Sequence, residues 1–509
     1  MAQQKPRLAK PTLDKDLEKL SSVEDAARHT ARGLAGPGVA LLFIILAAIF
    51  ASTYVTGTSG SVIVIAAAAL AGYMAMNIGA NDVTNNIGAA VGARAMTMGF
   101  GLALAAVFEV AGAVLAGGNV ATTIASGITN GALISSPNVL IWAMMAALLA
   151  AAVLINIATW ASAPISTTHS IVGAVMGAGI AAAGFGAINW GLVAGITASW
   201  VVSPVLGAMI AAAFLLLVKE TIIYREDKIT SAKTWVPVLI GIMTGVFAGY
   251  LTLVGGNQLR APSPYLASLV TVVTGLIAWR VLIPVIARQA EGLENRNQSL
   301  RKLFRIPLIL SAALMSFAHG ANDVSNAIGP LAAIVGAVQD VATGSVHRMP
   351  GVPLWELVIG GLGISLGLLL YGPKLVRLVG AEITKLNPMR AYCVSLSTGL
   401  TVLVASWIGM PVSSTHIAVG AVFGVGLFRE WYTRNSKRRY EYMRVRSGRD
   451  IQLEPEEREA GEHNDDEMKR RYLVRRSHIL SILVAWIITL PAAAGLAAII
   501  ATVMFALFL

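Results

Sequence analysis

The chain has 509 residues, of which 56% are hydrophobic and only 13% are charged. Soluble globular proteins usually carry about 25% charged residues, so this composition argues against a soluble protein. The formal net charge is +11, but the basic residues gather between apolar blocks, which favours a topology signal over a nucleic-acid site. The single cysteine, Cys393, excludes an intrachain disulfide and a multi-cysteine metal site.

Long apolar blocks follow an N-terminal tail of mixed charge, residues 1–37, which we expect to be cytoplasmic. The first block predicts a transmembrane span over 38–58. Further blocks, close to the roughly 20 residues that span a bilayer, lie near 61–76, 101–117, 139–160, 188–218, 236–254, 266–287, 354–371 and 479–508. They predict an all-α polytopic membrane protein with about 10–12 transmembrane helices, and we expect it in the plasma (inner) membrane.

Two motifs occur twice, in the same order. IGANDVTNNIG at 78–88 recurs as HGANDVSNAIG at 319–329, an offset of 241 residues. TWASAPISTTHSIVGAVMGAG at 159–179 recurs as SWIGMPVSSTHIAVGAVFGVG at 406–426, an offset of 247 residues. Two different motifs at nearly the same spacing indicate a tandem duplication.

The duplication divides the chain into a first repeat, 60–218, and a second repeat, 300–428. Connector loops and helices occupy 219–299, and a C-terminal span occupies 478–509. The segment 429–477 is rich in lysine and arginine, so we expect this charged loop to be cytoplasmic. Because transporter repeats are commonly inverted and carry broken helices near the membrane midplane, we expect two inverted repeats, each with a re-entrant helical hairpin.

The second motif, P-[IV]-S-[ST]-T-H, predicts the hairpins. In the second repeat the apolar runs at 396–410 and 417–428 look too short to cross about 30 Å at 1.5 Å per residue. Proline, serine and threonine favour helix starts, so these residues could simply cap a half-helix. A helix N-terminus within a membrane also binds anions, and two such ends with their hydroxyls would suit one tetrahedral oxyanion.

The first motif places a carboxylate and amides within about one helical turn. Asp82 alone could be a helix cap, but its repetition as Asp323 is harder to explain in that way, because ionisable groups at membrane depth are costly and usually mark ion or substrate pathways. Carboxylate and amide oxygens also suit small cations such as sodium. The amides that accompany the two aspartates are Asn81, Asn85, Asn322 and Asn326.

Carboxylates beside an anion site allow two explanations. The aspartates could bind coupling cations, or they could accept hydrogen bonds from a protonated oxyanion. Phosphate carries protons near neutral pH and sulfate does not, so ionised aspartates would repel sulfate. This favours phosphate, with sulfate as the alternative ligand.

Four other polar residues are weaker candidates. Glu109 lies inside an apolar helix and could have a coupling or a structural role, and Glu356 aligns with it at the 247-residue offset but could simply mark a helix entrance. His169 and His416 could titrate near neutral pH, although a packing or capping role fits their place after capping residues better. The Gly-x-x-x-Gly runs at 173–177 and 420–424 indicate tight helix packing.

Taken together, the paired motifs GANDV-x-N and P-x-S-[ST]-T-H resemble those of the inorganic phosphate transporter family over roughly 60–509. The resemblance implies a cation-coupled phosphate symporter and a homodimer. It implies phosphate binding by Asp82, Ser166, Thr167, Asp323, Ser413 and Ser414, and cation binding near Asn81, Asn85, Asn322 and Asn326. Additional candidates are Thr168, Thr415 and Glu109.

The chain departs from the family pattern in GANDVTNN, where the family more often has alanine after Val83 and after Asn85, and it lacks a glutamate near Ser395 that some relatives carry. We therefore expect a secondary transporter that couples phosphate to Na⁺ or H⁺ by alternating access, rather than an enzyme. We expect no cofactor, and no metal beyond the transported sodium. A sulfate permease of the same architecture and a channel-like anion sensor are the rival functions.

Overall fold

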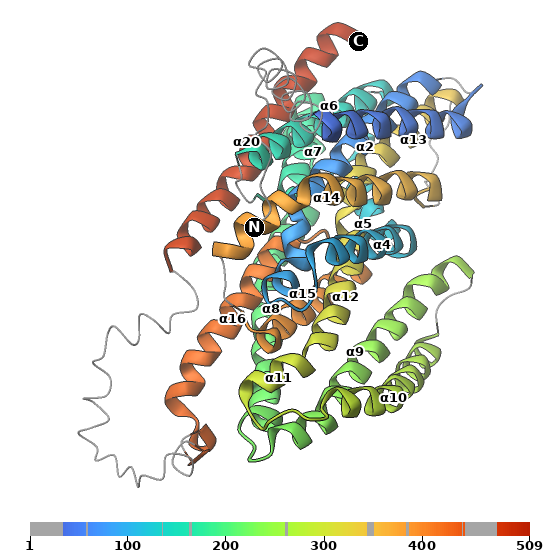
Figure 1. The fold of residues 1–509 in the computed structure, drawn as a ribbon. Helices are drawn as coiled ribbons and strands as arrows, with labels where there is room; N and C mark the ends of the chain where they lie inside the picture. The colour runs from blue at the N-terminus through green and yellow to red at the C-terminus, as the bar shows by residue number, and fades with distance from the viewer. Residues whose placement is uncertain are drawn as a thin grey trace, which may run out of the picture.

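The computed structural model describes residues 34–57, 60–134, 136–161, 165–259, 263–343, 351–382, 386–439, 441–442 and 476–509. The expectations for the tail before residue 34 and for most of the charged loop 429–477 fall outside these residues, as does Pro164 of the second motif. The described chain is helical, and Figure 1 shows its helices crossing one another at the centre of the molecule. The helices before the connector are Leu34–Val55, α2 (Ser61–Val83), α3 (Ala89–Gly92), α4 (Met98–Ala116), α5 (Gly118–Thr122), α6 (Pro137–Trp160), α7 (Thr167–Ala183) and α8 (Trp190–Val218).

The connector and the second half contain the following longer helices among the described residues. They are α9 (Lys228–Leu259), α10 (Pro264–Gln289), α11 (Asn297–Leu303), α12 (Arg305–Asp323), α13 (Ser325–Thr343), α14 (Leu354–Glu382), α15 (Pro388–Ile408), α16 (Ser414–Asn435) and α20 (Arg476–Phe508). Short π-helical segments are η1 (Thr84–Gly88), η2 (Thr123–Gly127) and η5 (Lys219–Ile223), and 3-10 turns are η3 (Gly131–Leu133) and η4 (Phe185–Ala187).

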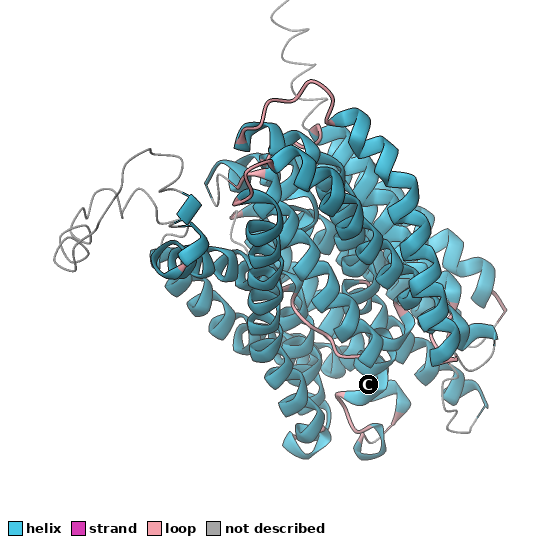
Figure 2. Cartoon of the chain, turned by 90° about the horizontal axis from the view of Figure 1, so that it is seen from below, coloured by secondary structure: helices cyan, strands magenta, loops and turns pink. Residues whose placement is uncertain are grey.

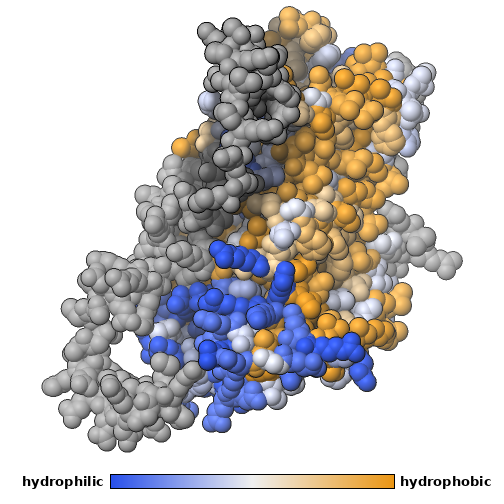
Figure 3. Space-filling view, viewed as in Figure 1, coloured by the Kyte–Doolittle hydropathy of each residue, from blue (hydrophilic) through white to orange (hydrophobic). Residues whose placement is uncertain are grey.

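Within the described residues, 11 helical segments are long and apolar enough to cross a membrane. Figure 2 shows them packed side by side, and the same residues form no strand, only an isolated bridge between Thr129 and Ile188. In Figure 3 apolar side chains cover much of the visible surface, and hydrophilic ones gather at the end where α11 lies. The expectation of an all-α, multi-pass membrane protein is therefore confirmed.

Both copies of the GAND motif lie within helical spans whose hydrogen-bond pattern changes at the motif. The first lies in the span 61–92, where the α-helix passes into the π-helical η1 two residues after Asp82. The second lies in the span 305–343, where only Val324 separates α12 from α13. A π-helical turn breaks the regular backbone pattern and is frequent at functional sites. Each aspartate therefore stands at an irregularity in the interior of a span.

The second motif lies at breaks between helices. α6 ends at Trp160 and α7 begins at Thr167, while α15 ends at Ile408 and α16 begins at Ser414. The expectation that the run at 396–410 is too short to cross is wrong, because α15 has 21 residues and is among the helices long and apolar enough to cross a membrane. α16 has 22 residues but is not among those described helices, so the expectation for the run at 417–428 is not contradicted. Both continue beyond the apolar runs, since the polar residues in the first half of α15 are buried against protein and α16 extends into a charged end. α7, with 17 residues, is short, and the re-entrant hairpin stays a prediction.

Close contacts between helices fix their relative directions. Along α2 and α14, Gly72 lies against Ile359 and Val83 lies against Gly372, so these two helices run parallel. Likewise α4 runs parallel to α12 and the start of α13, because Glu109 lies against Gly320 and Gly117 against Val324.

The helices α4 and α14 also touch, and they run in opposite directions. Gly361 lies against Ala113, further along α14 Gly372 lies against Leu102, and Ser365 donates to the Ala106 carbonyl at 2.8 Å. Because α14 is parallel to α2 while α4 is parallel to α12, α2 and α12 run antiparallel. The two aspartate-bearing helices thus approach the centre of the protein from opposite sides.

The glycines of the two Gly-x-x-x-Gly runs are points of close helix packing, as the sequence indicated. A Cβ on Gly177 would lie 2.0 Å from the Ala494 carbonyl oxygen, and one on Gly424 would lie 2.2 Å from that of Ala208. α20 therefore packs on α7 of the first repeat, while α8 packs on α16 of the second. The helix after the first copy of the second motif, α7, is therefore covered by the C-terminal span α20, and the helix after the second copy, α16, is covered by α8 of the first repeat.

This contact generates a prediction about stability. We expect Gly177→Ala to lower the unfolding temperature of the detergent-solubilised protein by several degrees, since overpacking costs about 1–3 kcal/mol. The matched control is Gly99→Ala in the first turn of α4, where a Cβ would meet nothing within 4 Å. Equal unfolding temperatures for the two variants would contradict the close contact of α7 with α20.

Candidate functional site

Asp82 is buried, with 1% of its surface exposed, and it receives hydroxyl donors from both repeats. Thr167, the first residue of α7, donates to its Oδ2 at 2.9 Å. Thr415 of α16 donates to its Oδ1 at 3.2 Å. The carboxylate of the first GAND motif therefore joins the starts of the two helices that follow the second motif.

Asp323 has the corresponding position in the second repeat and is fully buried. Ser414, the first residue of α16, donates to its Oδ2 at 3.2 Å. Ser414 corresponds to Thr167 at the 247-residue offset. The two repeats therefore use the same contact, a hydroxyl in the first turn of a helix bonded to the motif aspartate.

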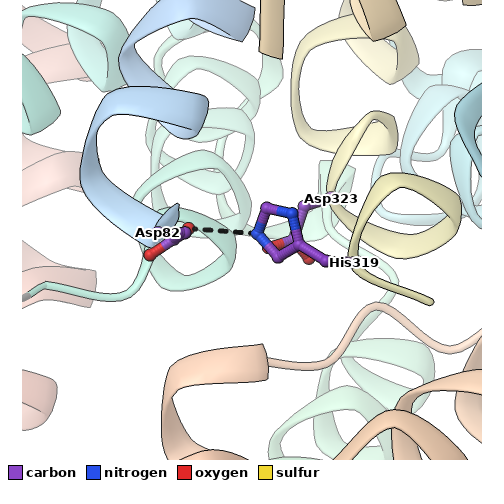
Figure 4. A group of neighbouring side chains, drawn as sticks. All are labelled: Asp82, His319 and Asp323. Atoms are coloured by element: carbon purple, nitrogen blue, oxygen red, sulfur yellow. Dashed lines mark ion pairs between the residues drawn. The ribbon is translucent and has the colours of Figure 1, made fainter. Parts of the chain in front are cut away.

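His319 lies between the two aspartates and is fully buried (Figure 4). Its Nε2 is 2.8 Å from Asp323 Oδ2 and 3.7 Å from Asp82 Oδ2. Its Nδ1 is 2.7 Å from Oε1 of Glu109, on α4. One imidazole thus contacts three buried carboxyl groups, and we call these four side chains the carboxylate–histidine cluster.

The charge of this cluster is unbalanced. If all three carboxylates are ionised, a protonated imidazole neutralises only one of them. Unpaired charges are costly in a dry interior, so the cluster favours additional cations or protons. Asp82, His319 and Asp323 each place a ligand atom within 4.8 Å of the others, which is close enough for all three to bind one ion.

Amide side chains surround the cluster. Asn86 donates to Glu109 Oε1, while its own Oδ1 and Oε2 of Glu109 are buried and receive no donor from the described residues. Oδ1 of Asn326 is likewise buried with no donor in the part of the chain that the structure describes. Buried acceptor oxygens are normally hydrogen-bonded, and oxygens that lack donors suit a hard cation.

Two asparagines connect the repeats reciprocally. Asn85 of the first repeat donates to Thr415 of the second at 2.8 Å, and Asn326 of the second donates to Thr168 of the first at 3.3 Å. Asn326 also approaches Thr167 at 3.5 Å. These bonds follow the duplication, because Asn85 corresponds to Asn326 and Thr168 to Thr415.

Asn81 and Asn322 attach the aspartate-bearing helices to the breaks of the second motif. Asn81 hydrogen-bonds Thr159 at 3.2 Å, and Asn322 hydrogen-bonds the corresponding Ser406 at 3.1 Å. With their amides turned over, both would also donate to the neighbouring aspartate, at 3.1 Å for Asn81 and 3.0 Å for Asn322. Either orientation leaves them beside a carboxylate.

Ser166 and Ser413 cap α7 and α16. Their hydroxyl oxygens accept from the backbone N–H of His169 at 3.1 Å and of His416 at 3.4 Å, as expected for N-cap residues. The two histidine rings meet with their centroids 4.4 Å apart, and His169 also packs on Trp200 at 3.8 Å. A packing position was the favoured interpretation of these histidines, and the ring contacts agree with it.

The structure brings most of the predicted site residues together, because hydrogen bonds and ion pairs link Asp82, Asp323, Thr167, Ser414, Thr415, Asn85, Asn326, Thr168 and Glu109 into one buried network. Two members were missed. His319 has Ile78 at the equivalent place in the first repeat, so a search for repeated polar residues passes over it. Asn86 occupies one of the positions where the family more often has alanine.

Glu356 is the remaining acidic candidate, and it is buried at the start of a helix. Neither of its carboxylate oxygens has a hydrogen-bond partner among the described residues. It lies in the first turn of α14, where the helix dipole favours a negative charge. No contact between described residues places it in the carboxylate–histidine cluster.

Comparisons with known proteins identify the family of the chain. A model of the phosphate transporter family matches residues 78–497. A candidate phosphate permease of Helicobacter pylori is 46% identical over 429 residues, which are 84% of this chain and 80% of the relative. One of Pyrococcus abyssi is 40% identical over 358 residues, 70% of this chain and 86% of the relative.

A solved structure is also similar. It is named the sodium-dependent phosphate transporter, superposes with a TM-score of 0.74 at 32% identity, and the match covers 88% of this chain and all of that one. The buried carboxylates, the paired helix starts and the family match over most of the chain point the same way. This chain belongs to the phosphate transporter family.

Proposed function

We propose that the protein is a secondary symporter that carries inorganic phosphate together with sodium ions by alternating access. The observation that carries the proposal is the burial of three carboxyl groups around one imidazole, beside the starts of α7 and α16. A phosphate anion cannot enter so negative a site without cations, so charge balance itself couples the two fluxes. The similar solved structure is that of a sodium-dependent transporter, which supports Na⁺ over H⁺.

Phosphate would bind between the N-termini of α7 and α16. The hydroxyls of Ser166, Thr167, Ser413 and Ser414 stand at these two helix starts, where backbone N–H groups and the helix dipole favour an anion. Asp82 and Asp323 would accept hydrogen bonds from the protonated oxygens of phosphate. Sulfate has no such protons, so the same aspartates would disfavour it.

The hydrogen bonds of the described state suggest an order of binding. Thr167 and Ser414 now donate their single hydroxyl protons to the aspartates. A cation that binds the aspartate oxygens would compete for those lone pairs and release the hydroxyls to donate to phosphate. Cation binding would therefore prepare the anion site, with Asn85, Asn326 and the acceptors at Asn86 and Glu109 as further oxygen ligands.

We further propose that the repeats are inverted and that the protein is a homodimer in the plasma membrane. The antiparallel course of α2 and α12 supports the inversion. For the dimer, the support is the family resemblance together with α10, whose membrane-length window is only 6% buried within one chain. Lipid would cover this helix wherever a second copy does not.

The aspartates provide the first test. We expect Asp82→Asn and Asp323→Asn each to reduce phosphate uptake into proteoliposomes about 100-fold or more, because asparagine keeps the shape but loses the charge that binds the cation. The matched control is Asp227→Asn, the same change at an exposed residue that caps the start of α9. Normal uptake by both site variants would overturn the proposed mechanism.

His319 provides the second test. We expect His319→Gln and His319→Ile each to lower uptake about tenfold or more, because loss of the imidazole leaves the negative charge of the buried carboxylates uncompensated. Isoleucine is chosen because Ile78 occupies the equivalent position of the first repeat. Thermal unfolding and gel filtration of both variants separate this loss from misfolding. Uptake at the normal rate by a folded His319→Ile would show that the imidazole has no role in transport.

The coupling ion provides the third test. At fixed pH, replacing external sodium by potassium should abolish phosphate accumulation, and a sodium ionophore should collapse an established gradient. A protonophore that collapses accumulation while sodium replacement does not would assign the coupling to protons.

In the same assay, a large excess of sulfate should leave labelled phosphate uptake unchanged, and strong competition would favour the sulfate permease.

A further inference from the structure

A pocket with a volume of about 530 Å³ lies away from the carboxylate–histidine cluster, at the ends of several helices. Its walls come from the turn between α3 and α4, the end of α11, the start of α12 and the start of α15. The lining residues are Gly92, Ala93, Arg94, Ala95, Arg301, Lys302, Arg305, Leu386, Asn387 and Pro388. We call this the basic pocket.

Four of these residues are cationic and none is acidic. Among the described residues, Arg94, Arg301, Lys302 and Arg305 make no ion pair, and all four are exposed. Arg305 Nε donates to the Ala95 carbonyl at 2.6 Å, which links the α12 wall to the α3–α4 turn. That bond leaves the terminal guanidinium nitrogens available to a ligand.

The backbone also brings cations and donors into this pocket. Arg94 has a φ of 58°, the only positive φ at a non-glycine residue of the described chain. Asn387 caps α15 by accepting from the Arg390 N–H at 3.0 Å, so the positive end of the α15 dipole opens on the same space. Four uncompensated cations around one hollow raise its positive potential and favour an anion with more than one charge.

We propose that the basic pocket binds a phosphate-bearing anion, at a site separate from the transport site. Guanidinium groups match phosphate oxygens with paired N–H donors. The volume lies within the range of about 300–1,000 Å³ that is typical of small-molecule sites, which leaves room for more than a phosphate ion. The apolar lining of Leu386, Pro388 and the alanines would contact the uncharged part of a larger ligand.

The place of the basic pocket limits the source of that phosphate. It lies at the α12 start and the α3 end, about ten residues of helix, or roughly 15 Å, beyond Asp82. The basic pocket lies at helix ends, so free phosphate and the headgroup of an anionic phospholipid are the two sources that we consider for its ligand. The two sources share the same recognition chemistry, and binding measurements distinguish them.

The pocket variant is Arg301→Gln with Lys302→Gln. The matched control is Arg225→Gln with Lys233→Gln, which removes the same two charges from residues that do not line the basic pocket. Both pairs are introduced into the full chain carrying Asp82→Asn and Asp323→Asn, so that phosphate binding at the transport site is removed in every sample. Gel filtration and thermal unfolding confirm that each protein is folded.

Two binding measurements follow. The first titrates inorganic phosphate into the detergent-solubilised proteins, and the second compares their thermal stability in nanodiscs of phosphatidylcholine with and without phosphatidic acid. We expect one of two results for the pocket variant: its affinity for phosphate falls about tenfold or more, or phosphatidic acid no longer raises its thermal stability. The control should keep its phosphate affinity within about twofold and should still be stabilised by phosphatidic acid. Loss in the first identifies free phosphate as the ligand, and loss in the second alone identifies the lipid headgroup.

Equal behaviour of the pocket variant and the control in both measurements would overturn the proposal. The inference rests on the geometry of the basic pocket, and its tests record binding rather than transport. If the unaltered protein does not transport phosphate, but the pocket variant binds the anion more weakly than its control, only the proposed function is refuted. A protein that transports phosphate with an inert basic pocket would refute the further inference alone.

Discussion

The structure depends on the cost of burying charge. Asp82, Asp323 and Glu109 lie inside a bundle of membrane-length helices, and a single imidazole contacts all three. Such an arrangement is stable only if protons or cations compensate the carboxylates, because an unpaired charge in this environment costs several kcal/mol. The hydroxyls and amides around the cluster are arranged to share that negative charge. Under the proposed function such a site would serve an anion carrier, since each cation that it attracted would reduce the cost of bringing phosphate to the same place.

The helix ends solve a second problem of the same kind. A chain that breaks within a membrane exposes backbone N–H and C=O groups that water cannot reach, so each break must find partners in the protein. Ser166 and Ser413 cap the two breaks, and Asn322 contacts the chain around Met410 and Val412. Residues that satisfy the backbone therefore also bring hydroxyl donors to the aspartates. In the proposed mechanism, structural capping and ligand binding would be two uses of one geometry.

The duplication made much of this arrangement predictable from the sequence. A polar motif written twice at membrane depth must lie in a shared interior, so Asp82 and Asp323 could be paired from the repeat alone. The same reasoning passed over His319, because its partner position holds Ile78 and a repeat-based search rewards symmetry. A search for ionisable residues next to the repeated motif would have found it.

Other features could not be predicted from local pattern. The lengths of α15 and α16 were underestimated because apolar runs stop at polar residues, whereas a helix does not have to. The polar residues at the start of α15 are buried against protein, and α16 continues into a charged end. The π-helical turn after Asp82 has no signature in composition, and Asn85 within it donates to Thr415, which lies far away in the sequence. The packing of α8 on α16 and of α20 on α7 depends on contacts between segments that lie far apart in the chain.

The two repeats differ in how their threonines contact the motif aspartates. The contacts Thr167 to Asp82 and Ser414 to Asp323 are equivalent, but those of the next residue are not. Thr415 donates to Asp82 across the repeats, whereas Thr168 donates to the backbone of Val412 instead of to Asp323. If two inverted halves exchange conformations during transport, the opposite-facing state is the one in which Thr168 reaches Asp323 and Thr415 turns to the chain near Ile165. In the described state Asp82 accepts hydrogen bonds from both repeats, whereas Asp323 accepts a hydroxyl only from its own repeat. Alternation between the two states would reverse this difference.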